Sequence, residues 1–218
     1  MVQTQLETPR IEGTAVIRNE PVQARSAARL TALLDAAAHV VHEIGYERLT
    51  TAMVADRAGA SIGTVYRYFP DRIAVLQSLA ARNVERTNGL ALAAVNDPRN
   101  ADWFSALGAV FDQIKAAFRD EPGFASLRYG DVLDLRPATT APAMQGFADS
   151  IFDALVSRFE LDDSAAARTA FAAVVVATDA LTARAFSLDP TGDEDFLLAG
   201  VATAAALMSP HWPAPAAG

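Results

Sequence analysis

The stretch ASIGTVYRYF, residues 60–69, gathers side chains that could contact an anionic surface. Two tyrosines carry hydroxyl groups suited to phosphate oxygens, and Arg67 between them can contact a phosphate or pair bidentately with a guanine. Gly63 allows the backbone to approach a ligand closely, and Thr64 offers a hydroxyl and a methyl group. Because a glycine and two β-branched residues make a poor helix, these residue types indicate a binding surface.

The sequence around this stretch predicts three helices. Leucine, valine and isoleucine recur at helical spacing over residues 27–45, which predicts a first amphipathic helix. Thr50 or Thr51 can cap a short second helix, and Ser61 can cap a third helix over the stretch itself. A short helix, a turn with a glycine and a second helix together make a helix-turn-helix, which presents its second helix to the DNA major groove.

Helical spacing divides the third helix into an inner and an outer face. Val65 and Phe69 are four residues apart, so we expect both to pack into the core of this unit. Two positions are open for Ile62: it packs inward beside Val65, or it touches a thymine methyl group. Arg25 and Arg29, at the start of the first helix, either reach phosphates or the minor groove, or lie on a solvated face.

The charge distribution separates the two halves of the chain. The 218 residues carry a net charge of −8, yet residues 1–90 balance to +1 and residues 91–218 to −9. Within residues 48–86 there are six arginines against three acidic residues. A local basic excess on an acidic body is a hint of a nucleic-acid-binding module.

Several classes of function and site lack support in the sequence. There is no cysteine, which excludes disulfides and thiolate metal sites and suits a reducing cytoplasm. His39 and His42 have no third ligand at suitable spacing, so we predict structural histidines and no metal. Phosphate-binding glycine loops and nucleophile motifs are absent, so we predict neither an enzyme nor a cofactor. No apolar run reaches the ~18 residues of a membrane span, so we expect a cytoplasmic protein without a membrane partner.

The rest of the chain also shows helical patterns, which predicts an all-α fold with about nine helices. Asp71 can cap a long helix from Arg72 to about Val95. Further long helices are expected over residues 163–186 and 193–208. The first of these two has two apolar faces, so we expect it to contact the core on one side and something else on the other.

Aromatic and charged residues of the second half suggest a cavity. An aromatic stripe from Trp103 to Phe118 forms either plain core or the floor of a ligand cavity. Arg128 either binds an anionic ligand or forms a surface ion pair. Asp179 lies among apolar residues, and its partner is a ligand, a group across a dimer or solvent at the rim. The candidate pocket residues are Trp103, Phe104, Leu107, Phe111, Arg128, Tyr129, Phe147, Ile151 and Asp179.

The segment LTTAMVADRAGASIGTVYRYFPDRIAVL, residues 49–76, resembles the DNA-binding helix-turn-helix of the tetracycline-repressor (TetR) family. The matching features are TT at the start of the second helix, A-x-x-A-G-x-S across the turn, G-T-x-Y-x-Y-F in the third helix and DR after it. The resemblance implies an all-α homodimer that binds DNA through the third helix and a small molecule in its C-terminal body. The expected DNA contacts are Thr51, Ser61, Ile62, Gly63, Thr64, Tyr66, Arg67, Tyr68 and Arg72, to which position adds Arg25 and Arg29.

With this resemblance the chain divides into four parts. We expect a flexible N-terminal arm (1–24), a helix-turn-helix DNA-binding domain (25–71), a ligand-binding and dimerisation domain (72–209) and a tail (210–218). The two long helices near the C-terminus are expected to pack against their dimer mates in a four-helix bundle. Candidate contacts for this bundle are Val175, Val176, Ala183, Gly200, Ala204 and Leu207.

The resulting hypothesis is a transcriptional regulator, most simply a repressor that leaves a near-palindromic double-stranded operator when a small-molecule effector binds. Half-sites about one helical turn apart, ~34–36 Å, match a two-fold dimer. Two alternatives stay open: an activator or protein-responsive regulator, and a small-molecule-binding protein whose helix-turn-helix is vestigial. A body without a cavity would favour the first alternative over control by a small molecule. Affinity for random duplex DNA that does not change with salt would favour the second alternative over DNA binding.

Overall fold

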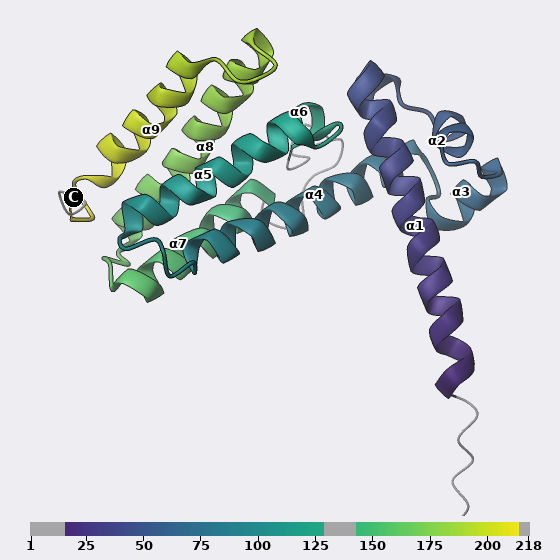
Figure 1. The fold of residues 1–218 in the computed structure, drawn as a ribbon, viewed down its shortest axis with the longest axis horizontal. Helices are drawn as coiled ribbons and strands as arrows, with labels where there is room; N and C mark the ends of the chain where they lie inside the picture. The colour runs from purple at the N-terminus through teal and green to yellow at the C-terminus, as the bar shows by residue number, and fades with distance from the viewer. Residues whose placement is uncertain (1–15, 129–142, 214–218) are drawn as a thin grey trace, which may run out of the picture.

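The computed structural model describes residues 16–128 and 143–213, and the chain is helical through most of them (Figure 1). For these residues the predicted all-α fold with about nine helices is confirmed. In chain order the elements are α1 (Val16–Ile44), the 3₁₀ helix η1 (Tyr46–Arg48), α2 (Thr51–Arg57), α3 (Ile62–Tyr68), α4 (Arg72–Val95), α5 (Trp103–Asp120), α6 (Phe124–Leu127), α7 (Ala143–Phe159), α8 (Ala165–Leu188) and α9 (Glu194–Met208).

Helices α1, α2 and α3 and the first half of α4 form a small N-terminal unit, here called the head (Figure 1). Its two short helices begin at the predicted caps. The Thr50 side chain accepts a hydrogen bond from the Met53 backbone N–H at 3.2 Å. Ser61 Oγ accepts one from the Thr64 backbone N–H, also at 3.2 Å. Gly59 turns the chain between them with φ +57°, a conformation that glycine adopts without steric cost, so the predicted helix-turn-helix is present.

The head has its own hydrophobic core, which holds α3 in place. Val65 and Phe69 are buried in this core, as predicted. They pack with apolar residues of α1, the η1–α2 segment and α4, namely Leu33, Ala37, Val41, Leu49, Val54, Leu76 and Leu79. Asp71 accepts a hydrogen bond from the Ala74 backbone N–H at 2.8 Å and thereby starts α4 at the predicted residue.

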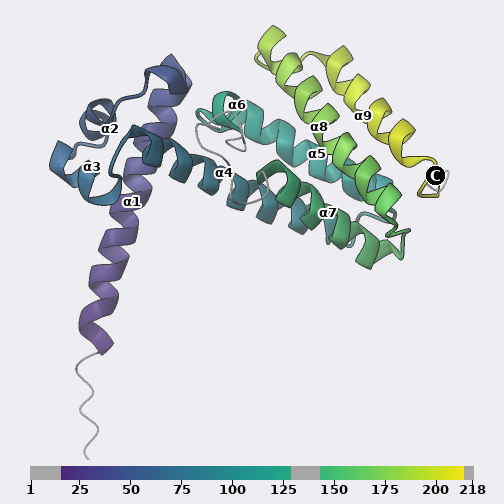
Figure 2. The same cartoon turned by 180° about the vertical axis from the view of Figure 1, so that it is seen from behind.

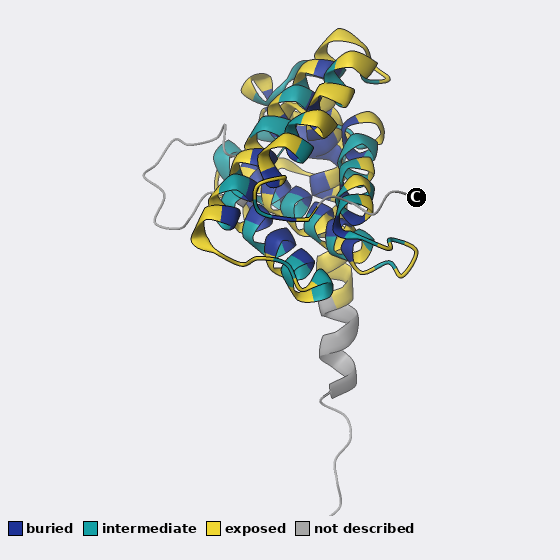
Figure 3. Ribbon diagram, turned by 90° about the vertical axis from the view of Figure 1, so that its left-hand side faces the viewer, coloured by how far each residue is buried: buried dark blue, intermediate teal, exposed yellow. Residues whose placement is uncertain are grey.

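Helices α5, α7, α8 and α9 form the body together with the second half of α4 (Figures 1 and 2). The outermost helix is α9, which lies along α8, and α8 in turn packs against α5 and α7. Buried residues line the inner sides of these helices, and exposed residues cover their outer sides (Figure 3). Contrary to the expectation from the sequence, α8 is by length and composition apolar enough to span a membrane; it contacts α5, α7 and α9, and 28% of its most apolar window is buried.

The start of the first helix differs from the expected one. Helix α1 begins at Val16 rather than at Ala27, so residues 16–24 belong to a helix and not to an arm. Pro21 indicated an irregular segment, but it lies at the sixth residue of this helix.

Residues 210–213 are packed against the body instead of forming a free tail. Trp212 is buried, with its ring centroid 5.2 Å from that of Trp103 and 5.6 Å from that of Phe152. Its Nε1 donates a hydrogen bond to the Asp162 carbonyl oxygen at 3.0 Å. Trp103 Nε1 donates to the Pro213 carbonyl oxygen at 2.8 Å. Trp103 is therefore a core residue of the body that anchors the C-terminal segment.

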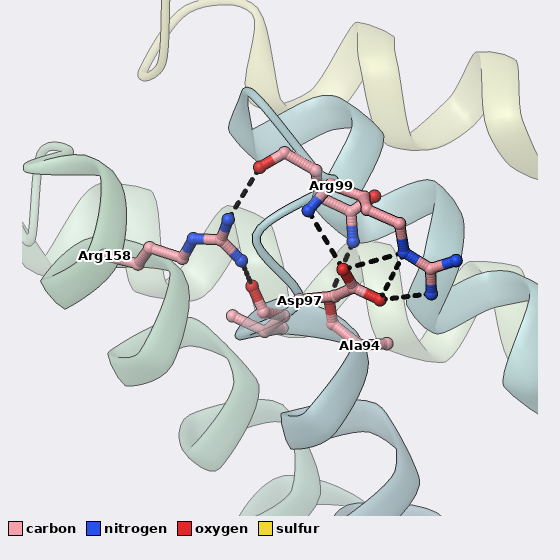
Figure 4. A network of polar contacts seen from close by, with 6 residues as sticks. Ala94, Asp97, Arg99 and Arg158 are labelled. Atoms are coloured by element: carbon pink, nitrogen blue, oxygen red, sulfur yellow. Dashed lines mark hydrogen bonds and ion pairs between the residues drawn. The ribbon is translucent and has the colours of Figure 1, made fainter.

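Two arginines hold the loop between α4 and α5 (Figure 4). The Asp97 carboxylate accepts hydrogen bonds from Arg99 Nε at 3.0 Å and from the Arg99 backbone N–H at 2.9 Å. These bonds stabilise the charged form and lower the Asp97 pKa to about 2. Arg158 of α7 donates to the carbonyl oxygens of Val95 and Asn100. The body therefore fixes the end of α4 that lies away from the head.

The one-turn helix α6 contacts both the head and the body. Leu127 belongs to the head core, whereas Phe124 packs edge to face on Phe118 of α5. Gly123 precedes the turn with φ +74°, and a Cβ at this residue would lie 2.7 Å from the Ala38 carbonyl oxygen. Helix α1 therefore packs directly on the backbone of this turn.

Candidate DNA interface and ligand cavity

The exposed face of α3 carries residues predicted to contact DNA. Ile62 is 43% exposed and Tyr66, one helical turn later, is 53% exposed. Gly63 and Arg67 beside them are also exposed. Ile62 is therefore accessible from outside, which favours contact with a ligand over the alternative in which it packs inward beside Val65. An exposed apolar side chain at the start of such a helix suits contact with a thymine methyl group.

Hydrogen bonds prepare the polar groups of this face. Ser61 Oγ and Thr64 Oγ1 are 2.9 Å apart and share a hydrogen bond. Thr51 Oγ1 of α2 donates to the Tyr66 hydroxyl at 3.3 Å. Because a phenol can accept and donate at the same time, the Tyr66 proton is left to bind an acceptor such as a phosphate oxygen.

Two predicted DNA contacts have partners inside the head. Tyr68 is half-buried, and its hydroxyl lies 3.2 Å from Ser26 Oγ of α1. Arg72 is also half-buried, and its Nη1 donates to the Glu47 carbonyl oxygen at 3.0 Å. In this conformation both side chains brace α3 and α4 against neighbouring segments.

Arg25, Arg29 and Arg67 surround an open hollow between α1 and α3, which Tyr68 also lines. All three arginines are exposed, and none pairs with an acidic side chain among the described residues. Two other arginines of the head do have acidic partners. Arg57 pairs with Glu43 at 2.5 Å, which lowers the pKa of the Glu43 carboxyl, and Arg82 pairs with Asp35 at 2.6 Å. Arg25, Arg29 and Arg67 therefore lie together around this hollow without acidic partners among the described residues.

The body contains a cavity of about 80 Å³ between α5, α7, α8 and α9. Six predicted pocket residues line it: Phe104, Leu107, Phe111, Phe147, Ile151 and Asp179. Trp103 and Arg128 do not line it, and Tyr129 lies outside the described residues. Lining residues that the sequence did not indicate include Phe171, Val174, Thr178, Thr182, Gly200 and Val201.

Asp179 is buried at the wall of this cavity. It is 9% exposed, and its Oδ2 lies 3.4 Å from Arg128 Nε. Asp179 therefore does not lie at a solvated rim, and Arg128 forms an ion pair with it in which the Arg128 side chain stays partly exposed. Arg128 follows α6 directly, and its carbonyl oxygen accepts a hydrogen bond from Asn83 Nδ2 of α4 at 3.4 Å. One residue thus links the cavity wall to the helix that enters the head.

The candidate dimer contacts fall into two groups. Val176 and Leu207 are exposed, at 57% and 36%. The other candidates, Val175, Ala183, Gly200 and Ala204, lie wholly or largely inside the protomer, against the cavity or the core. Leu198 and Val201 of α9, which were not among the candidates, are also exposed, at 58% and 37%. Sequence spacing alone could not single out these two residues, because the side of α9 that is exposed is known only from the structure.

Two protein-family models match the chain. The model of bacterial regulatory proteins of the tetR family matches residues 33–79, and the model of a tetracyclin repressor-like C-terminal domain matches residues 101–206. The HTH-type transcriptional repressor KstR of Rhodococcus jostii (strain RHA1) is 31% identical over 90 residues. These residues are 41% of this chain and 41% of KstR, so the match spans about two fifths of that curated relative.

Solved structures agree with the chain over a larger part of its length. A TetR-family transcriptional regulator from Streptomyces coelicolor matches with a TM-score of 0.71 and 29% identity, over 84% of this chain and 99% of that chain. FadR from Bacillus subtilis, solved in complex with stearoyl-CoA, shares the fold with a TM-score of 0.60 and 18% identity, over 82% of this chain and 97% of that chain. Because the family models match both the head and the body, the chain belongs to the tetR family of DNA-binding transcriptional regulators.

Proposed function

We propose that this protein is a cytoplasmic, homodimeric repressor that binds a near-palindromic operator through α3 and leaves it when a small molecule occupies the body cavity. The observation that carries the DNA-binding part is the face of α3, where exposed Tyr66 and Arg67 lie beside two further arginines without acidic partners among the described residues. Repression is supported by the KstR relative, which is a repressor by name.

The proposed complex contains three kinds of contact between the protein and DNA. Tyr66 and the arginines of the hollow supply donors to phosphates, which position the protein without selecting a sequence. Arg67 can pair bidentately with a guanine. Ile62 is the apolar group on this face and, in the proposed complex, contacts the methyl group of a thymine. We therefore expect the operator to contain an A·T pair at the position that faces Ile62.

Uracil substitution tests the role of Ile62 directly, because uracil differs from thymine only by the methyl group. An operator is first selected from a random pool, and each thymine is then replaced in turn. Wild type is expected to lose affinity severalfold at one thymine of each half-site, and Ile62→Ala is expected to be insensitive to the same replacement. Met53→Ala is the matched control, because Met53 is also 43% exposed but lies on α2. Equal sensitivity in wild type and Ile62→Ala contradicts the contact.

The dimer is proposed to form through the outer faces of α8 and α9. Val176, Leu198, Val201 and Leu207 are exposed apolar side chains on these two helices, and contact with a second copy removes them from water. Leu198→Glu is expected to convert the dimer to a monomer at micromolar concentration in sedimentation velocity. Leu90→Glu on α4 is the control, because Leu90 is 42% exposed but lies away from this face. A dimer that survives Leu198→Glu contradicts this interface.

Release by a small molecule is supported by the size and position of the cavity. A cavity that holds benzene measures about 150 Å³, so a ligand of that size must move the helices around a cavity of about 80 Å³. Asp179 on the cavity wall pairs with Arg128, and Arg128 is bonded to α4. Widening of the cavity is therefore expected to shift α6 and α4, and with them the head, toward a state that does not bind the operator.

A further inference from the structure

The polar side chains that line the cavity among the described residues turn hydrogen-bond acceptors toward a ligand. Thr178, Asp179 and Thr182 are the polar side chains among the described lining residues, and their spacing places them on one face of α8. Thr178 Oγ1 donates its proton to the Val174 carbonyl oxygen at 2.7 Å, and Thr182 Oγ1 donates to the Thr178 carbonyl oxygen at 2.7 Å. Each hydroxyl is left with lone pairs, and an ionised carboxylate has only acceptors. A ligand group placed here must therefore supply a donor.

The charge of the carboxylate is already compensated. Arg128 approaches Asp179 within 3.4 Å without lining the cavity. A cationic ligand would therefore add a second positive charge beside one carboxylate, away from water, and desolvating an ion is costly unless it gains its own partner. An anionic ligand group would face acceptors and the like charge of Asp179. A neutral donor avoids both penalties.

The remaining wall is apolar and partly aromatic. The rings of Phe104, Phe111, Phe147 and Phe171 lie around the cavity. Such a wall favours a ligand body without further polar groups, because each buried polar group needs a partner that the wall does not offer.

We propose that the effector is an uncharged, largely apolar alcohol or phenol whose hydroxyl donates a hydrogen bond to Asp179, with Thr178 and Thr182 as further acceptors. The inference rests on the proposed effector role of this cavity and adds the chemical class of the ligand. It implies that carboxylates and amines of the same size bind less well.

A set of small benzene derivatives separates these classes on the full-length dimer. Phenethyl alcohol and benzyl methyl ether are isomers, and only the alcohol donates a hydrogen bond. Phenylacetate and phenethylammonium supply the anionic and cationic members. Isothermal titration calorimetry is expected to show the alcohol binding about tenfold to a hundredfold more tightly than the ether, the range that a hydrogen bond to a charged group provides. The alcohol is also expected to displace a fluorescent operator duplex.

Variants assign the selectivity to the cavity. Asp179→Asn offers an amide donor as well as an acceptor, so the alcohol and the ether are expected to bind within about threefold of each other. Thr182→Val is expected to weaken alcohol binding and to leave the fold intact. Thr169→Val is the matched control, because Thr169 makes the same bond to the carbonyl oxygen four residues earlier, at 2.8 Å, but is exposed outside the cavity.

The possible outcomes are distinct. If the ether, the carboxylate or the ammonium ion binds as tightly as the alcohol or more tightly, the inference that the effector is a neutral hydrogen-bond donor is overturned. If one of these compounds also displaces the operator, the proposed control by a small molecule still stands. If no member of the set binds or displaces the operator, both the ligand class and the proposed effector role of the cavity fall. If Asp179→Asn and Thr182→Val still prefer the alcohol to the ether, the group that accepts the ligand's hydrogen bond lies elsewhere, and the inference is also overturned.

Discussion

Replacement of Gly123 by alanine tests the contact through which α1 meets the α6 turn. Gly123 has φ +74°, and the left-handed conformation costs an L-residue about 1–2 kcal/mol. The added Cβ would lie 2.7 Å from the Ala38 carbonyl oxygen and 3.1 Å from Val41 Cγ1. Neither neighbour is the end of a flexible side chain, and overpacking of this kind costs a further ~1–3 kcal/mol. The free energy of unfolding is therefore expected to fall by about 2–5 kcal/mol.

Gly59→Ala separates the two contributions. Gly59 also has a positive φ, +57°, but an added Cβ there meets no atom within 4 Å, so only the backbone cost of about 1–2 kcal/mol applies. Urea unfolding of both variants and of wild type measures the difference, at one fixed protein concentration because the stability of a dimer depends on concentration. Equal losses for the two variants would refute the direct packing of α1 on the turn.

Three further predictions concern α3, the C-terminal segment and the α4–α5 loop. Tyr66→Phe removes the hydroxyl that Thr51 bonds, and fluorescence anisotropy is expected to show a similar loss of affinity for every duplex sequence, since phosphates are the expected partners. Trp212→Ala empties a fully buried position and is expected to lower the free energy of unfolding by ~3–5 kcal/mol in urea. Arg99→Gln removes side-chain hydrogen bonds that lower the Asp97 pKa to about 2, so NMR titration is expected to show this pKa rising toward 3.8. Because the folded pKa is lowered, the stabilisation from this pair is present above pH 3.8 and is lost as the pH falls through 2.

Each of these predictions has a contrary result. A change of sequence preference in Tyr66→Phe would assign its hydroxyl to a base. Stability of Trp212→Ala within 1 kcal/mol of wild type, well below the usual cost of emptying such a site, would mean that residues 210–213 leave the body in solution. An Asp97 pKa that stays near 2 in Arg99→Gln would assign the lowered value to other groups.

Local signals predicted the head well because its helices are started by their own side chains. Ser61 and Asp71 each accept a hydrogen bond from a backbone N–H three residues later, and this capping depends on short-range geometry alone. The inward position of Val65 and Phe69 also followed from spacing. Ile62 did not, because it lies between the two faces of α3, and only the packing of α2 against α3 decides its exposure.

The cavity was harder to predict because it depends on contacts between distant segments. The aromatic stripe of α5 divides: Phe104 and Phe111 face the cavity, whereas Trp103 packs on Trp212 and Phe118 packs on Phe124. Spacing within one helix cannot show which neighbour each ring meets. Likewise, the small residues of α9 suggested a dimer contact, yet Gly200 lies against Phe111 inside the protomer. Small residues permit close helix approach in either setting.

The most direct test of DNA binding by the α3 face is the salt dependence of duplex affinity. Fluorescence anisotropy with a random duplex, repeated from low to high salt, is expected to give a linear fall of log K with log salt, with a slope of about −0.9 for each phosphate contacted. Replacing Arg25, Arg29 and Arg67 together by glutamine is expected to make this slope less negative by up to about three. A flat response in wild type, or a slope that the triple replacement leaves unchanged, would contradict DNA binding through this face.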